Sequence, residues 1–238
     1  IHRHMQGSKS YTAPFKVAVL NSWGNLRRWM ANQVHHALWY REIYSYVGVL
    51  EALSGMPLDV EFITFEEMKE GIDPAIRVII NAGDAYTAFS GGDVWKDPAL
   101  VCALRRFVDE GGGFIGVGEP TACQYQGRFF QLSDVLGVDR ELGFSLSTDK
   151  YNELNREHFI LEDVKGEVDF GEGKSRIYAQ GEHYQILNMD GQYSRLVVNA
   201  YGQGRSVYFS GLPYSPQNCR ILLRAIYYAA HREKKKKK

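Results

Sequence analysis

Short apolar runs separated by amphipathic stretches make up the first half of the chain. A strand covered on both faces of a parallel sheet has no polar side, so such runs predict buried strands. The predicted strands are residues 16–21, 58–64, 77–82 and 114–117. Helices are predicted over 34–53, 66–70 and 97–110. Strands that alternate with helices are typical of an α/β fold with a mainly parallel sheet flanked by helices.

The pattern changes in the second half. A helix is predicted over 129–136, and short strands over 175–179, 184–188, 196–200 and 206–210. Tyr-Gly-Gln-Gly at 201–204 predicts a hairpin turn, which adds antiparallel strands to the C-terminal part. Pro216 begins a last helix that runs to His231. We expect one α/β domain over 14–231, with an N-terminal extension (1–13) and a lysine-rich tail (232–238).

Composition and charge narrow the classes of function. With 45% hydrophobic and 13% aromatic residues, the 238-residue chain can bury a large core. Its net charge is zero, but five of the 28 basic residues form the run 234–238. Without that run, 23 basic residues face 28 acidic ones, a balance of −5 that does not favour binding to nucleic acid. No apolar run approaches the ~18 residues of a membrane span, and the polar start is no signal peptide, so we expect a cytoplasmic protein.

Cysteine and histidine spacing gives no support for a metal site or a cofactor. The three cysteines, Cys102, Cys123 and Cys219, fit neither a disulfide framework nor a zinc site, and are read as reduced, mostly packed thiols. His35 and His36 are adjacent, so they point to different faces of a helix. We therefore expect no metal and no cofactor.

Glycines between a predicted helix and a predicted strand formally satisfy the dinucleotide-binding motif. In such a site the glycines follow a strand and open a helix, so that the helix N-terminus meets the pyrophosphate. Here Gly111, Gly113 and Gly116 follow a helix and lead into a strand. The order is reversed, and the glycines are read as a helix end and a tight turn.

The end of the strand at 114–117 is the position where a nucleophile often sits in α/β enzymes. Gly118 occupies this tip and has no side chain to attack with, so acyl transfer lacks its first component. Cys123, five residues later, lies away from the tip. Glu119 is read either as a functional carboxylate or, preferentially, as a hydrogen-bonded structural acid.

Polar and aromatic residues gather in the loops after the first and third predicted strands. These loops and Glu119 should emerge at the same edge of the sheet, the edge that carries ligand sites in α/β folds. Arginines suit phosphate and tryptophan faces suit sugars, which indicates a carbohydrate or phosphate site; an aromatic interface with another domain or subunit is the preferred alternative. The candidates for substrate binding or interdomain contact are Asn21, Trp23, Arg27, Arg28, Asp84 and Glu119.

Two resemblances add to this picture. The strand arrangement, the segment GGGFIGVG (111–118) and the turn GLPY (211–214) resemble class I glutamine amidotransferase-like domains, a flavodoxin-like three-layer fold. Those families carry a cysteine where Gly118 stands, so the resemblance does not extend to amidotransferase activity. A closer one covers nearly the whole chain: residues 11–24, 31–37, 48–57, 112–120, 126–131 and 169–174 resemble the central domain of the lacto-N-biose phosphorylases, glycoside hydrolase family 112.

This closer resemblance implies a reaction, and it implies that the catalytic acid lies in another domain. Members of the family, which includes galactosyl-rhamnose phosphorylases, cleave β-galactosides such as lacto-N-biose and galacto-N-biose with inorganic phosphate, giving α-galactose 1-phosphate with inversion. An inverting phosphorylase needs one carboxylic acid on the leaving oxygen, and the resemblance implies that this acid lies in an N-terminal barrel domain outside this chain. We therefore assign no catalytic residue here.

Three hypotheses remain open at this stage. The first, and favoured, is a non-catalytic central domain that contacts the barrel of the same polypeptide, in an enzyme expected to be a homodimer. The second is a carbohydrate-binding or interaction module that mainly builds a dimer. The third is a self-contained hydrolase or sugar-binding domain that uses Glu119 and Asp84.

Overall fold

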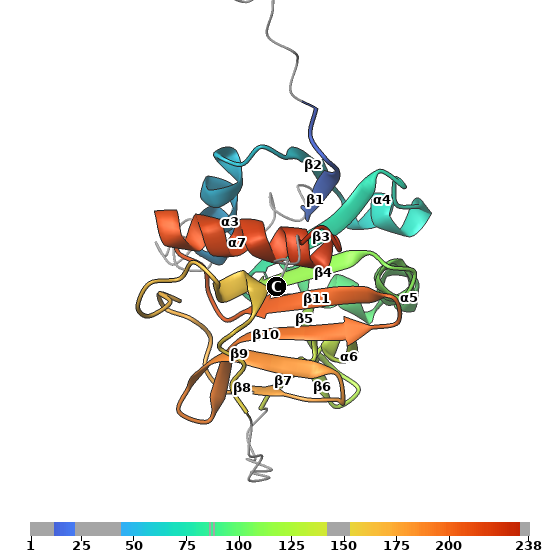
Figure 1. Cartoon of the computed structure of the whole chain (residues 1–238). Helices are drawn as coiled ribbons and strands as arrows, with labels where there is room; N and C mark the ends of the chain where they lie inside the picture. Colours follow the sequence, from blue (N-terminus) through green and yellow to red (C-terminus); the bar gives the residue numbers. More distant parts are fainter. Residues whose placement is uncertain (1–11, 22–43, 86, 88, 142–152, 234–238) are drawn as a thin grey trace, which may run out of the picture.

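The computed structural model describes residues 12–21, 44–85, 87, 89–141 and 153–233. Its centre is a seven-stranded sheet with the order β2-β1-β3-β4-β11-β10-β9 (Figure 1). The strands are β1 (Lys16–Leu20), β2 (Asp59–Ile63), β3 (Ile76–Gly83), β4 (Gly113–Gly118), β9 (Tyr184–Asp190), β10 (Tyr193–Tyr201) and β11 (Gly204–Phe209). The first five in spatial order are parallel, and β10 and β9 continue the sheet in antiparallel pairing. This confirms the predicted mainly parallel sheet, in the order typical of flavodoxin-like folds.

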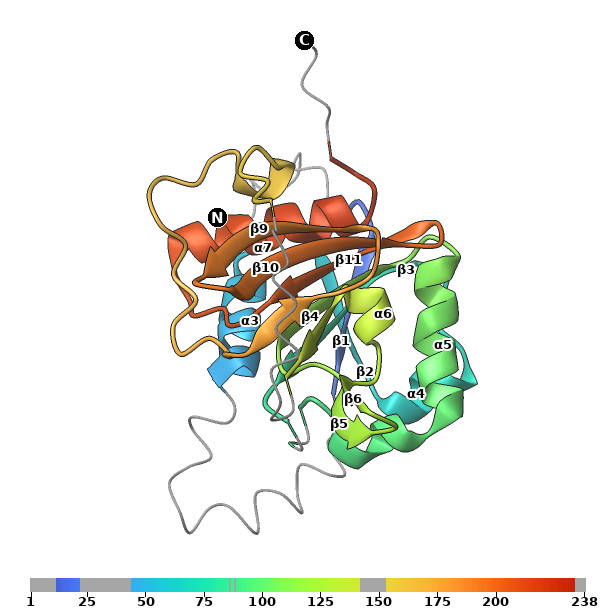
Figure 2. The ribbon, with the colours of Figure 1, turned by 90° about the horizontal axis from the view of Figure 1, so that it is seen from below.

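Helices cover both faces of the sheet (Figures 1 and 2). One face carries α3 (Tyr44–Ser54) and α7 (Pro216–Ala229); the other carries α4 (Phe65–Glu70), α5 (Pro98–Asp109) and α6 (Ser133–Leu136). Two short 3₁₀ helices, η3 (Gly92–Lys96) and η4 (Phe159–Leu161), lie in the connections. In the described part of the chain, no helix has both the length and the apolar character that crossing a membrane would need.

The core is divided into two layers by the sheet. Along β3, Val78 and Ile80 pack on the α3 and α7 side, whereas Ile79 packs on the α5 side, and all three are fully buried. Successive side chains of a strand point to opposite faces, so a strand buried on both faces must be apolar throughout. The last helix, α7, also buries its apolar face, which consists of Ile221, Leu222, Ala225, Ile226 and Ala229. The described residues therefore form an apolar core on each side of the sheet.

The predicted helix over 129–136 is wrong in its first part. Arg128–Phe130 forms β6, which pairs with β5 (Ala122–Tyr125), and α6 begins only at Ser133. Gln126 and Gly127 have positive φ angles of 52° and 77° and form the turn between the two strands. The Asp139 carboxylate accepts the backbone N–H groups of Phe129 and Phe130, at 3.2 and 2.9 Å, and holds them extended.

Other elements follow the predictions more closely. The helix predicted over 97–110 is α5, where Asp97 accepts a hydrogen bond from the Ala99 N–H at 2.9 Å and Pro98 occupies the first turn. The predicted helix over 34–53 is helical from Tyr44 to Ser54, and its earlier part lies outside the described residues. An unpredicted strand, β7 (Val138–Arg140), pairs with β8 (Ile177–Ala179). The 83–95 segment, predicted as loop, contains part of η3.

The fold makes stability depend on pH through His158. Its Nδ1 accepts the Ile160 N–H at 3.2 Å, and its ring packs edge-on against Tyr228. Burial, and next the charge of Arg205, lower the pKa of His158 from 6.5 to about 4. The unfolded chain therefore binds a proton that the folded chain excludes, and stability is lost as pH falls from about 6.5 to about 4. We expect about 1 kcal/mol, less than the full linkage value because the ring is partly exposed.

Urea unfolding at pH 7 and pH 4.5 measures this dependence. In His158→Phe the loss between the two pH values should shrink, whereas the exposed His183, changed to Gln, should leave it unaltered. An identical pH dependence in His158→Phe would contradict the assignment.

Candidate functional site

The carboxyl edge of the parallel strands gathers charged side chains from four separate segments. Asp84 follows β3 and Glu119 follows β4, while Arg140 ends β7 and Lys174 precedes β8. The Lys174 ammonium lies 2.8 Å from Asp84 and 3.8 Å from Glu119. Arg140 binds the other oxygen of Glu119. We call these four residues the edge cluster.

Glu119 is the buried centre of the edge cluster, with 5% of the residue exposed. Its Oε2 accepts the Ala85 N–H at 2.8 Å, and its Oε1 accepts from Arg140. A buried carboxylate needs such donors, because burial without them costs several kcal/mol. Both oxygens are occupied, which agrees with the preferred interpretation of a structural acid that fastens the segment after β3.

Lys174 reaches the edge because its segment crosses the end of β11. The Lys174 N–H donates to the Ser210 carbonyl at 2.8 Å, and Arg195 donates to the Gly173 carbonyl at 2.8 Å. Gly211 makes this crossing feasible, since a Cβ there would lie within 2.3 Å of the Phe170 carbonyl oxygen. Asn218 of α7 fixes the start of the segment by donating to the Asp169 carbonyl at 2.9 Å.

Sequence reasoning did not single out Lys174 or Arg140. Both follow Asp84 and Glu119 by 20 or more residues along the chain. Arg140 is on the unpredicted strand β7, and Lys174 lies in the connection before β8. Arg140 also stacks over the Phe129 ring, with its guanidinium carbon 4.9 Å from the ring centroid. The only available signal was that 169–174 belongs to the segments that carry the resemblance.

The structure places the other predicted candidates unevenly. Asn21 follows β1 at the same edge and is 2% exposed, and its Nδ2 has no hydrogen-bond partner in the part of the chain that the structure describes. Its backbone N–H donates to the Ile63 carbonyl at 2.9 Å. Trp23, Arg27 and Arg28 lie outside the described residues.

Gly118 forms the tip of β4 with a φ of +80°. A Cβ built there would lie 2.9 Å from both the Gly83 carbonyl oxygen and the Ser45 Oγ. The Gly118 carbonyl accepts the hydroxyl of Tyr208, a fully buried residue whose pKa is raised well above its ordinary value by burial. The chain then turns through Thr121, with a φ of 59°, into strand β5 instead of a helix. The tip has the backbone turn of a nucleophile position without the side chain or the following helix.

Cys123 offers no replacement nucleophile. Its side chain is fully buried and packs in the core layer beneath α5, where its Sγ lies 3.6 Å from an Asp93 carboxylate oxygen. Burial, and next the negative charge of Asp93, raise the pKa of this thiol. A raised pKa keeps sulfur in the unreactive thiol form. All three cysteines are free, with Cys219 partly buried and Cys102 exposed, which agrees with the expectation of reduced, mostly packed thiols.

The sequence matches the family model described as lacto-N-biose phosphorylase central domain over residues 16–234. The chain belongs to this family. A 1,3-beta-galactosyl-N-acetylhexosamine phosphorylase of Lachnoclostridium phytofermentans is 53% identical over 242 residues, covering 100% of this chain and 33% of the relative. The enzyme of the same name from Bifidobacterium longum subsp. longum is 44% identical over 263 residues, covering 96% and 35%. This central domain thus spans about a third of the length of these relatives.

A solved structure described as ThuA-like, from Bacteroides uniformis, has the same fold. It superimposes with a TM-score of 0.53 at 12% identity, and the match covers 94% of each chain. At this identity the likeness concerns the fold alone, and it supports the amidotransferase-like α/β architecture of the lacto-N-biose phosphorylase central domain.

The described residues of this central domain form a charged edge with a glycine at the strand-end position. They contain no group of three or more histidine, cysteine or acidic side chains that could hold a metal ion. The strand-end position is a glycine, and the nearby carboxylate is bound by donors on both oxygens. The edge cluster can therefore fix loops and present a charged surface, whereas covalent catalysis lacks its nucleophile.

Proposed function

We propose that this chain is the central domain of a phosphorylase that cleaves β-1,3-galactosyl-N-acetylhexosamine with inorganic phosphate to give galactose 1-phosphate. The observation that carries the proposal is the family match over residues 16–234, joined by 53% and 44% identity to two enzymes with that name. In an inverting phosphorolysis, phosphate attacks the face of the sugar opposite the leaving oxygen, which one carboxylic acid protonates. That acid belongs, in this proposal, to a barrel domain in the remainder of the enzyme.

The proposed role of the domain within the enzyme is structural. Its carboxyl edge presents the edge cluster together with Tyr214, which follows β11 and is 57% exposed. Exposed aromatic residues beside charged groups are typical of contact surfaces. We therefore propose that this edge contacts the catalytic barrel of the same polypeptide. Homodimerisation of the full-length enzyme stays a prediction, which its light-scattering mass would check.

Phosphorolysis assays on two proteins test the proposal. The 238-residue chain alone should release no galactose 1-phosphate from lacto-N-biose or galacto-N-biose, because in this proposal the general acid belongs to the barrel domain. The full-length enzyme should release it from both, and more slowly from galactosyl-rhamnose. A folded full-length protein without activity on any of the three substrates would overturn the proposed reaction, and activity of the chain alone would overturn the structural role.

A matched pair of variants in the full-length enzyme tests the contact edge. Tyr214→Asp should weaken the association of barrel and central domain and so reduce activity. Tyr125→Asp changes another exposed tyrosine, on the β5–β6 hairpin, and serves as the comparison. Equal activity of the two variants would contradict a contact centred on Tyr214.

A further inference from the structure

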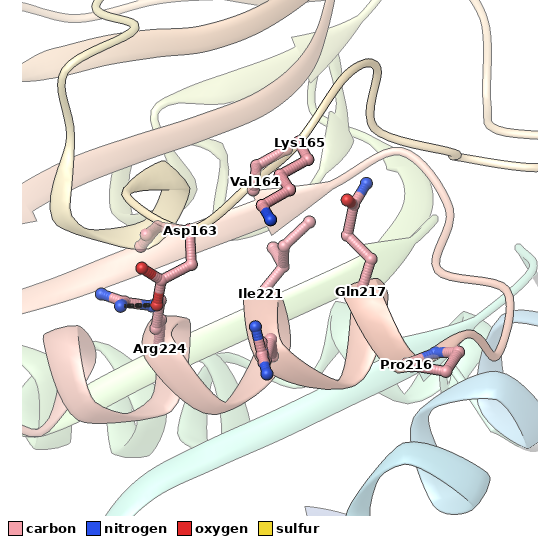
Figure 3. A pocket seen from close by; sticks show the side chains of 9 residues that line it. Asp163, Val164, Lys165, Pro216, Gln217, Ile221 and Arg224 are labelled. Carbon is pink, nitrogen blue, oxygen red and sulfur yellow. Dashed lines mark hydrogen bonds and ion pairs between the residues drawn. The ribbon is translucent and has the colours of Figure 1, made fainter.

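A preformed cavity lies between α7 and the segment after η4, away from the edge cluster (Figure 3). Its volume is about 280 Å³, close to the lower end of the range of small-molecule sites. Residues at i, i+3, i+4 and i+7 of a helix share one face, and one wall consists of Gln217, Arg220, Ile221 and Arg224 of α7. Asp163, Val164 and Lys165 form the opposite wall and reach toward the helix in Figure 3.

Hydrogen bonds at both ends hold the two walls together. At one end, the Gln217 amide donates to the Glu167 carbonyl at 3.0 Å. At the other end, Arg224 donates to the Phe159 carbonyl at 2.9 Å and pairs with Asp163 and Glu162. The two helix residues are two turns apart, a rise of about 10 Å. The space between the ties is therefore part of the folded structure and does not have to be opened by a ligand.

The cavity combines an apolar lining with two exposed cations. The apolar lining that a ligand can reach consists of Val164, which is partly exposed, and Pro216, which is exposed, whereas Ile160 and Ile221 are almost fully buried. Arg224 is committed to Asp163 and Glu162, but Lys165 and Arg220 have no hydrogen-bond or ion-pair partner within the described ranges. Two uncommitted cations beside an apolar surface suit a small organic dianion, since cations bind phosphate oxygens through strong charge-assisted hydrogen bonds.

We propose that this cavity binds a phosphate monoester, with Lys165 and Arg220 on the phosphate and the apolar side chains of Val164 and Pro216 beside the carbon skeleton. A phosphate monoester carries a charge of about −1.5 to −2 at pH 7, which the two cations match. The apolar lining favours an organic ester over inorganic phosphate. The inference goes beyond the proposed function, because it adds a binding site for a phosphate ester and does not depend on which galactoside is cleaved.

Calorimetric titration of the 238-residue chain with galactose 1-phosphate tests the inference. We expect saturable binding that is at least tenfold tighter than the binding of inorganic phosphate or of galactose. Succinate, which separates its two charges, should bind more weakly as well. Equal binding of inorganic phosphate, galactose or succinate would overturn the assignment to a phosphate monoester, and the absence of any binding would overturn the site.

Variants locate the binding within the molecule. The changes Arg220→Gln and Lys165→Gln should each weaken binding about tenfold, the loss expected for one charge-assisted contact. Arg106→Gln is the control, because Arg106 is an exposed cation on α5, across the sheet from α7. The same titration on the full-length enzyme, with the cavity variants compared there too, should retain the effect. If the full-length enzyme has lost the site, the cavity is a contact between domains and the proposal is wrong.

Discussion

A cysteine substituted for Gly118 is expected to destabilise the domain by about 3 kcal/mol and to confer no glutaminase activity. The φ of +80° strains any residue with a Cβ, and that Cβ would lie 2.9 Å from the Gly83 carbonyl oxygen. The Gly83 oxygen cannot retreat easily, because it also accepts the Glu119 N–H at 2.9 Å. Urea unfolding and an assay for glutamate release measure the two parts of this prediction.

The lack of activity has a separate structural cause. The residue after Gly118 begins a turn and a strand, so no helix N-terminus stands behind the tip to stabilise an oxyanion. Among the described histidines, His158 and His231 lie beside the C-terminal end of α7, where Ala229 packs against Gly113 at the start of β4. That is the opposite edge of the sheet from Gly118. A variant that released glutamate would contradict this account.

A second glycine isolates the contribution of backbone strain. Gly127 has nearly the same φ, +77°, but a Cβ there would have no neighbour within 4 Å. Gly127→Ala should therefore cost only the strain, about 1 kcal/mol. If Gly118→Cys and Gly127→Ala were equally destabilising, the close approach to Gly83 would not matter.

Removal of the Glu119 side chain is expected to lower the free energy of unfolding by about 2 kcal/mol. Glu119→Ala leaves the Ala85 N–H without its acceptor and leaves Arg140 and Lys174 without their shared carboxylate. The loss is smaller than for a fully buried ion pair because solvent reaches both cations, whose side chains are 32% and 25% exposed. Chemical denaturation measures the energy, and amide exchange at Ala85 should become faster.

Two comparisons separate the contacts of Glu119. Glu119→Gln keeps an oxygen for the Ala85 N–H and should retain the slow exchange there while losing the charge pairing. Asp134→Ala removes an exposed ion pair with Arg105 and should cost less than about 1 kcal/mol. Wild-type stability of Glu119→Ala would show that the edge cluster does not hold this part of the fold together.

Local sequence was sufficient to predict the elements whose own residues favour one type of secondary structure. The apolar run at 77–82 could only be a strand covered on both faces, and Asp97 followed by Pro98 could only start a helix. The hairpin turn at 201–204 was likewise evident from its glycines, and Tyr201 pairs with Gly204 across it. Once these elements were in order along the chain, the mainly parallel sheet followed from the rules of strand–helix–strand connection.

The secondary structure of the segment at 129–136 could not be predicted from local sequence. Its apolar residues suit a helix and a strand equally well, and the choice was made by Asp139, whose carboxylate holds Phe129 and Phe130 in extended form. Hydrogen bonds donated to a residue on another strand have no counterpart in the periodicity of the segment itself.

Only the tertiary structure assembled the two sites. Glycine at 118 and the strand-end position of Glu119 were visible in the sequence, but the partner Arg140 ends a strand of another sheet and Lys174 lies in the segment before β8. The cavity beside α7 likewise needs a loop and a helix separated by some fifty residues, tied by Gln217 and Arg224. Charge pairs and cavities depend on distances in space between distant segments, whereas apolar periodicity and capping residues act within a few positions of the chain.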